Sequence, residues 1–167
     1  MIHLVWSIFN VVIIFFFIYL IFGFIVEGMK IFETRFRIIS ISILILGIFQ
    51  IISASNTKKQ TNKIILKSNY NQTNNSKVKE VLLEDNLIFD INLHIKFSID
   101  KNEFTPIESY SYLTGFTSGY VWEYKSIEIN TCKPNRKTEF TAKGILKWHL
   151  FGINIYNESK VFRAYIE

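Results

Sequence analysis

Two apolar runs near the start of the chain constrain its fold more than any other feature. The first covers residues 4–26 and the second covers residues 38–54, with a short charged break between them. A helix that spans a membrane needs about 20 apolar residues, within a range of about 17–25. The first run meets this length and the second just reaches it. We therefore predict a transmembrane helical hairpin over residues 1–54, embedded in a lipid bilayer.

A cleaved signal peptide is the alternative for the first run. Such a peptide begins with basic residues and has an apolar stretch of about 7–15 residues. Residues 1–25 contain no Lys or Arg, and the apolar run is longer than that. These features favour a retained membrane span.

The charges are distributed unevenly along the chain. Residues 55–79 hold six lysines and no acidic residue, whereas residues 80–167 hold ten basic and twelve acidic residues. A slightly acidic domain argues against nucleic-acid binding, which usually requires a basic folded surface. We interpret residues 55–79 as a basic polar linker, which either contacts anionic lipid headgroups or is simply solvated.

The same lysines bear on membrane topology. Lys and Arg flanking a span favour the cytoplasmic side, and counting the segment after the second run places both termini there. Counting only around the first run gives the reverse orientation. We favour a multi-pass protein of the inner (cell) membrane whose C-terminal domain lies in the cytoplasm.

Residues 80–167 are predicted to form an antiparallel β domain. Apolar and polar residues alternate without interruption over residues 89–100, which is typical of a strand with one buried face. Further strands are predicted at 78–83, 120–130, 140–150 and 161–166, and the change of parity in the third predicts a bulge near Lys125–Ser126. Turn-forming residues occur at 100–102, 105–106, 132–137 and 157–159. The fold class is thus a membrane α-helical hairpin plus an all-β domain, either a small antiparallel barrel or a sandwich.

Catalytic motifs are missing from the sequence. His3, His94 and His149 have no metal-ligand spacing, and Cys132 has no second cysteine to pair with. No P-loop, GxSxG or GxGxxG motif occurs. We predict a protein that is not an enzyme and that needs no metal or cofactor.

A binding site is the more plausible prediction. Residues 109–120, SYSYLTGFTSGY, combine aromatic, hydroxyl and glycine residues in the manner of a ligand-binding loop. Basic residues on the polar faces of the strands would hold an anion if those faces met, although such faces usually point to solvent. Trp122 and Trp148 fit core positions as well as ligand stacking. The candidate ligand-binding residues are Lys96, Tyr112, Trp122, Lys143, Lys147 and Arg163.

Two N-terminal apolar helices followed by a compact all-β domain resemble the two-helix, β-rich effectors of bacterial cyclic-oligonucleotide antiphage (CBASS) systems. The resemblance covers the whole chain as architecture and size. The Gly-x-Trp that begins the family's barrel is absent after the second helix, and its nearest match here is Gly119-Tyr-Val-Trp122. The resemblance implies a β domain that binds a cyclic oligonucleotide, forms a homo-oligomer and disrupts the membrane in antiviral defence. The alternative is an envelope interaction, immunity or assembly protein that binds a protein partner.

Overall fold

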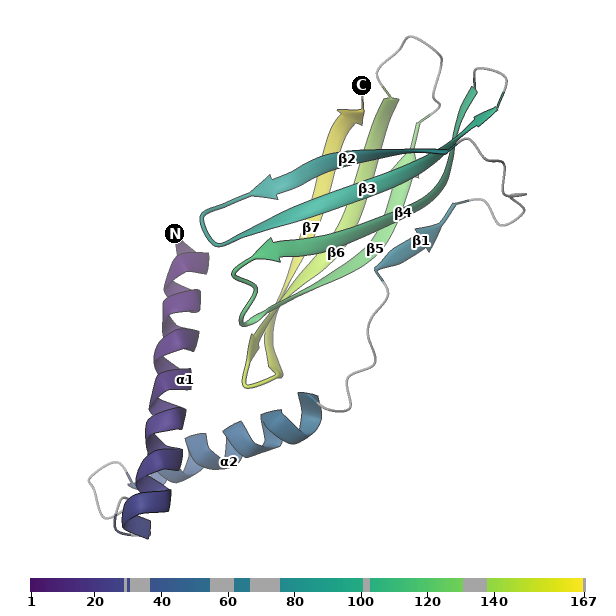
Figure 1. The fold of residues 1–167 in the computed structure, drawn as a ribbon. Coiled ribbons are helices and arrows are strands. Elements are labelled where there is room, and N and C mark those ends of the chain that lie inside the picture. The colour runs from purple at the N-terminus through teal and green to yellow at the C-terminus, as the bar shows by residue number, and fades with distance from the viewer. Residues whose placement is uncertain are drawn as a thin grey trace. The chain divides into compact units, whose positions relative to one another are not determined.

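The computed structural model describes residues 1–28, 30, 37–54, 62–66, 76–100, 103–130 and 138–166, without the side chains of residues 49–54, 100, 103 and 104. The chain forms two compact units. The first comprises Met1–Lys59 with His149–Ile155, and the second comprises Gln60–Trp148 with Tyr156–Glu167. The first unit contains the helices and the second contains most of the β-structure (Figure 1).

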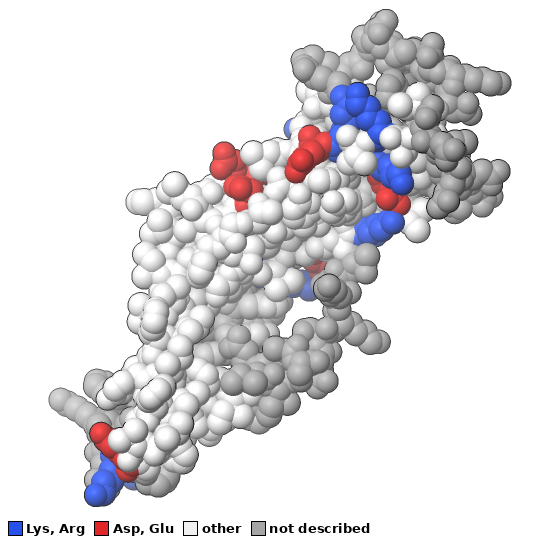
Figure 2. Space-filling view, in the orientation of Figure 1, with Lys and Arg blue, Asp and Glu red and all other residues white. Residues whose placement is uncertain are grey.

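Helix α1 (Ile2–Glu27) is long and apolar enough to cross a membrane, although a signal sequence passes the same test. It has no charged side chain before Glu27, and in Figure 2 the blue and red side chains appear only at its C-terminal end. Helix α2 (Arg37–Ala54) has 18 residues, and its segment Arg37–Ile48 is a shorter apolar helix. Within the described residues, α1 is the one helix that meets the length for a span, so the second span stays a prediction.

The two helices pack against each other through small and aliphatic side chains. Leu20 of α1 is buried against a group of partly buried residues, and Gly47 of α2 faces the ring of Phe17. A Cβ at position 47 would overlap that ring, so glycine is required for this approach. The residues packed on Leu20 are Phe16, Ile41, Ile43 and Leu44.

The strands form two antiparallel sheets (Figure 1). The four-stranded sheet has the order β1-β4-β3-β2, and the three-stranded sheet has the order β5-β6-β7. The strands are β1 (Lys63–Ile65), β2 (Ser76–Asp85), β3 (Phe89–Asp100), β4 (Glu103–Gly115), β5 (Tyr120–Ile129), β6 (Thr138–Leu150) and β7 (Ile153–Ile166).

The two sheets make a sandwich whose core lies between their inner faces. Alternate residues of β3, β5 and β6 are buried there, as the alternation of the sequence predicts. Side chains rather than shared backbone ladders connect the sheet edges: Asn62 Nδ2 donates to the carbonyl of Trp122 at 2.8 Å, and Asn62 Oδ1 accepts from the backbone N–H of Tyr124 at 3.1 Å. Because the described strands divide into two sheets, the sandwich alternative is confirmed and the closed-barrel alternative is wrong. The core side chains are Phe89, Ile91, Leu93, Ile95, Phe97, Ile107, Tyr120, Trp122, Tyr124, Ile127, Phe140, Ala142, Leu146, Trp148 and Ile166.

Several predicted strands are confirmed. The strand predicted at 89–100 is β3, and the one predicted at 78–83 lies within β2. The predicted bulge in β5 occurs where the register with β6 shifts between Tyr124 and Ser126. Strand β2 begins at Ser76, and β1 lies within the segment interpreted as linker.

Two predicted turns are wrong because both lie inside strands. Thr105–Pro106 belongs to β4, where a register shift opposite Lys96–Phe97 accommodates a proline that has no N–H to donate. Residues 157–159 belong to β7, which begins at Ile153 instead of Val161. The predicted turns at 100–102 and 132–137 fall mostly or wholly outside the described residues.

Candidate binding face

Strand β4 places two serines inside the sandwich and two tyrosines outside it. Ser109 and Ser111 are 1% and 0% exposed, and each is paired with a core residue of β3. Neighbouring residues of a strand point to opposite faces, so Tyr110 and Tyr112 lie on the outer face of the four-stranded sheet. This reverses the usual preference for burying an aromatic residue and exposing a serine.

Large side chains of β5 occupy the space in front of the two serines. Trp122 Nε1 donates to Ser111 Oγ at 2.9 Å, and that hydroxyl donates to the carbonyl of Asn92 at 2.7 Å. The hydroxyls of Ser109 and Tyr124 share a hydrogen bond of 2.9 Å. Burial raises the pKa of Tyr124 to about 12, although the hydrogen bond with Ser109 opposes the shift. The serines thus satisfy buried polar groups that an apolar residue would leave unpaired.

The two outward tyrosines form a cluster with a histidine and a glutamate. The rings of Tyr110 and Tyr112 are nearly parallel, with centroids 5.6 Å apart, and the His94 ring lies 4.7 Å and 5.2 Å from them. Tyr112 Oη donates to Glu80 Oε1 at 3.3 Å and lies 3.0 Å from His94 Nε2. His94 Nε2 is 2.9 Å from the same carboxylate oxygen. Desolvation, followed by the charge and hydrogen bond of Glu80, raises the pKa of Tyr112, which keeps the phenol protonated at neutral pH.

Aliphatic side chains and balanced charges surround this cluster. Tyr110 is 42% exposed, and exposed aliphatic residues flank it on β1 and β2. Lys63 pairs with Glu108 at 2.7 Å, so the two lysines of the surface are matched by two glutamates. We call this surface the tyrosine face; it comprises Lys63, Ile65, Val78, Glu80, Leu82, Asn92, His94, Lys96, Glu108, Tyr110 and Tyr112.

Two of the predicted ligand-binding residues lie on the tyrosine face. Lys96 and Tyr112 come from the adjacent strands β3 and β4 and point to the same side of the sheet. Trp122 instead lies in the core, where its indole N–H is used by Ser111.

The other predicted cations belong to the outer surface of the three-stranded sheet. Lys143 pairs with Glu128 at 2.9 Å, and Lys147 pairs with Glu123 at 2.8 Å. Arg163 is exposed on β7. The structure therefore does not bring these three cations together with Lys96 and Tyr112.

Glu123 is the most strongly perturbed of the exposed acids. Its carboxylate accepts from Lys125 Nζ at 2.6 Å and from Lys147 Nζ at 2.8 Å. These two hydrogen bonds, in that order, lower the pKa of Glu123 to about 2 against the opposing effect of desolvation. The group stays ionised and satisfied, so it is a structural cross-strand clamp instead of an acid–base catalyst.

The segment predicted as a flexible binding loop, residues 109–120, is mostly strand. Residues 109–115 belong to β4, Tyr120 begins β5, and a turn covers only residues 116–119. The loop prediction is wrong because serine and glycine were taken as loop formers, whereas Ser109 and Ser111 are buried strand residues.

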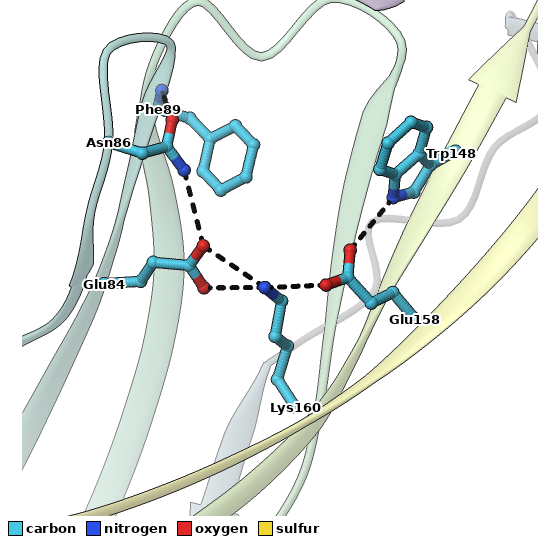
Figure 3. A network of polar contacts seen from close by, with 6 residues as sticks. All are labelled: Glu84, Asn86, Phe89, Trp148, Glu158 and Lys160. Atoms are coloured by element: carbon cyan, nitrogen blue, oxygen red, sulfur yellow. Dashed lines mark hydrogen bonds and ion pairs between the residues drawn. The ribbon is translucent and has the colours of Figure 1, made fainter. Parts of the chain in front are cut away.

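A polar network that the sequence did not suggest connects β2 to β7 (Figure 3). Lys160 Nζ lies 3.1 Å from Glu84 Oε2 and 2.8 Å from Glu158 Oε1. Trp148 Nε1 donates to Glu158 Oε2 at 3.3 Å, and Asn86 Nδ2 donates to Glu84 Oε1 at 3.4 Å. Burial opposes the charge of Lys160, yet the hydrogen bonds from Lys160 to Glu158 and Glu84 raise its pKa. The network connects the sheet edges opposite the Asn62 contact.

A bulge and an alternation explain how these residues meet. The register of β2 with β3 shifts between Leu82 and Glu84, which turns Glu84 toward the core side of the sheet. In β7, Glu158 and Lys160 are in phase with Phe162, which contacts Trp122 across the sandwich. This alternation was the available signal, and the assignment of residues 157–159 to a turn concealed it.

Among the described residues, no three His, Cys, Asp or Glu side chains are placed to hold a metal ion. Cys132 lies outside those residues.

Comparison with known proteins gives no assignment for the chain. No family model matches it, and no curated protein matches it. A crystal structure of a two-domain protein of unknown function from Bacteroides thetaiotaomicron is similar with a TM-score of 0.42 and 12% identity. The match covers 54% of this chain and 47% of that one, so this chain spans about half the length of the solved structure it resembles.

Proposed function

We propose that this chain is a membrane-anchored, non-enzymatic recognition protein whose tyrosine face binds a protein partner. The observation that carries the proposal is the reversed alternation of β4, which leaves Tyr110 and Tyr112 outside. Aromatic residues are enriched at the centres of protein interfaces, and polar groups form their rims. The tyrosine face has this composition, with stacked tyrosines beside exposed Ile65, Val78 and Leu82 and a balanced set of charges.

In this proposal the helices keep the sandwich at the membrane. Helix α1 serves as the first span and α2 as the second, in the inner membrane, with the sandwich in the cytoplasm. Six lysines in residues 55–79 lie next to the headgroups, where each contributes about 1 kcal/mol of attraction to anionic lipid.

A pair of tyrosine variants tests the partner site. Tyr110→Ser removes the exposed ring of the face, and Tyr165→Ser removes a ring that is 61% exposed on β7 and outside the face. Each variant is expressed as the full chain and purified from native membranes after mild cross-linking. We expect the partner recovered with the wild type to be reduced at least tenfold by Tyr110→Ser and unchanged by Tyr165→Ser. Equal recovery from both variants contradicts the proposal.

A second candidate is a nucleotide-sensing effector, in which the tyrosine face binds a cyclic oligonucleotide. The parallel rings of Tyr110 and Tyr112 offer a stacking surface for a base, and Lys96 is two positions along the strand from His94. Ligand binding would favour a homo-oligomer by its differential affinity. Crowded α2 helices, shorter than α1, would then disturb the bilayer in antiviral defence.

Equilibrium binding separates the two candidates. Full-length protein in detergent micelles is titrated with cyclic di- and trinucleotides, and Lys96→Gln is compared with Lys143→Gln on the other sheet. The effector reading predicts saturable binding that Lys96→Gln weakens about tenfold while Lys143→Gln has no effect. Lack of binding by the wild type excludes these nucleotides as ligands and leaves the protein-partner reading.

A further inference from the structure

Two turns at one end of the sandwich expose large apolar side chains. Leu87, between β2 and β3, is 92% exposed, and Phe116, between β4 and β5, is 45% exposed. The turns are adjacent because the backbone N–H of Phe116 donates to the carbonyl of Ile88 at 2.7 Å (Figure 1). A soluble protein has little reason to place such side chains on neighbouring turn tips.

A row of aromatic rings lies directly behind these turns. Phe89 begins β3, and its ring centroid is 4.9 Å from that of Tyr120, which begins β5. Tyr120 is 5.5 Å from Trp148, and Trp148 is 5.9 Å from Tyr156. Tyrosine and tryptophan are the residues enriched at membrane–water interfaces.

The turn between β6 and β7 has the same apolar character. Phe151 and Gly152 both have positive φ angles, as a two-residue type I′ turn requires. Asparagine, aspartate or glycine usually occupies the first position, and a bulky residue at positive φ is an outlier. Ile153 and Ile155 follow and are exposed. A strained phenylalanine at a tip indicates that the side chain is selected for what it contacts.

The connections at the other ends of these strands have the opposite composition. Residues 101–102 are Lys-Asn, and residues 131–137 contain three basic residues and no aliphatic residue. The polarity of the domain therefore runs along the strands, from apolar turns to basic ones.

The direction of β1 places the apolar end on the side from which the chain arrives. The backbone N–H of Ser111 donates to the carbonyl of Asn62, and Ile65 is paired with Glu108. Because β4 runs toward the Phe116 turn, the chain enters β1 from that end. Only residues 55–62 separate α2 from β1, so the sandwich begins a short way along the chain from the helix that we predict as the second span.

From these observations, we propose that the apolar turns around Leu87, Phe116 and Phe151 insert into the interface of the bilayer that carries α1. The proposal rests on the membrane anchor of the proposed function, and its occupant is a lipid surface. The tyrosine face lies on the side of the sheet and not at this end, so it stays open to a partner while the turns are inserted.

Depth-dependent quenching in vesicles tests the proposal. The full chain carries Cys132→Ser and one new cysteine, at Leu87→Cys, Phe116→Cys or Glu128→Cys, labelled with an environment-sensitive fluorophore. Glu128 is the control because its side chain is 66% exposed and it lies near the far end of β5. The protein is reconstituted into phosphatidylcholine–phosphatidylglycerol vesicles, recovered by flotation, and exposed to nitroxide lipid or to aqueous iodide.

We expect nitroxide lipid to quench positions 87 and 116 at least threefold more than position 128, and iodide to show the opposite order. If the protein floats with the vesicles but all three positions behave alike, the inserted turns are refuted while the anchor stands. Protection of positions 87 and 116 from both quenchers also refutes insertion, because it indicates a covering protein surface. If the protein does not float, the anchor itself fails, and the insertion proposal fails with it.

Discussion

Gly144 sets how closely β6 approaches the indole of Trp122. A Cβ at this position would overlap the Trp122 ring and lie 2.9 Å from the carbonyl of Glu123. The backbone atom cannot yield as a flexible side chain would, so the cost appears as displaced packing in the core. Trp122 also donates to Ser111, so any displacement disturbs the β4 serines on which the tyrosine face depends.

Replacing Gly144 with alanine should therefore destabilise the sandwich. We expect a loss of about 1–3 kcal/mol in the free energy of unfolding, as for other overpacked core sites. Chemical denaturation of the full chain in detergent micelles, followed by tryptophan fluorescence, measures it. Lys143→Ala, on the outer face beside it, is the control, and an equal effect of the two changes would refute this role for Gly144.

Phe151 shows the reverse situation, because here the native residue is the strained one. Its positive φ suits asparagine better than phenylalanine. Phe151→Asn should raise the free energy of unfolding in micelles by about 1 kcal/mol while weakening the contact of the turn with lipid. Phe151→Ala separates loss of the ring from relief of strain, since alanine removes the ring but keeps the unfavourable φ. If Phe151→Asn is no more stable than Phe151→Ala, the strain argument is wrong.

At the scale of elements, Lys160 holds β7 beside β2 through two carboxylates. The raised pKa of Lys160 means that its contribution is fully present below its ordinary pKa of 10.5 and is lost only as the pH rises through the higher value in the fold. Lys160→Met leaves Glu84 and Glu158 facing each other without a cation.

We expect Lys160→Met to cost on the order of 3 kcal/mol, as when one partner of a buried pair is removed. Adding Glu84→Gln and Glu158→Gln to Lys160→Met removes the uncompensated charges and should restore much of the loss. Denaturation midpoints at neutral pH measure both effects. A triple variant as unstable as the single one would show that packing of the lysine stem, and not charge, holds the edges together.

The clamp on Glu123 ties β5 to β6 and responds to acid. Its pKa of about 2 lies below the ordinary value of 4.5, so the ionised group stabilises the fold above pH 4.5. This contribution is lost as the pH falls from 4.5 toward 2. Glu123→Gln should lower the melting temperature at neutral pH and make it depend less on pH over that range. Parallel melting curves for wild type and variant would contradict the assignment.

The strands could be predicted where one face is consistently apolar. Phe89–Asp100 and the parity change of β5 were readable because each buried position holds a large apolar residue. The reading failed where the core uses polar or small residues. Ser109 and Ser111 depend on the distant aromatic side chains of β5, and Glu158 and Lys160 depend on a bulge in β2, so no local pattern reveals them. The candidate site was missed in the same way, since only Lys96 and Tyr112 of the predicted set lie on it.

At the scale of the whole molecule, the chain combines an apolar N-terminal helix with a two-sheet sandwich whose surfaces differ in character. The wide uncoloured area beside the charged side chains in Figure 2 illustrates this contrast on one side of the molecule. The outer surface of the three-stranded sheet is neutralised by its own ion pairs, Lys143 with Glu128 and Lys147 with Glu123. The tyrosine face instead keeps an aromatic surface exposed to solvent, which is why we assign recognition to it.

Site-specific photo-cross-linking tests that assignment most directly. A photoreactive phenylalanine derivative replaces Tyr110 on the tyrosine face or, as the control, Tyr165 on β7, and cells are irradiated before the membranes are isolated. We predict a discrete adduct of the full-length chain from position 110 and none from position 165. Absence of an adduct at position 110, or the same adduct from both positions, would contradict the tyrosine face as the recognition surface.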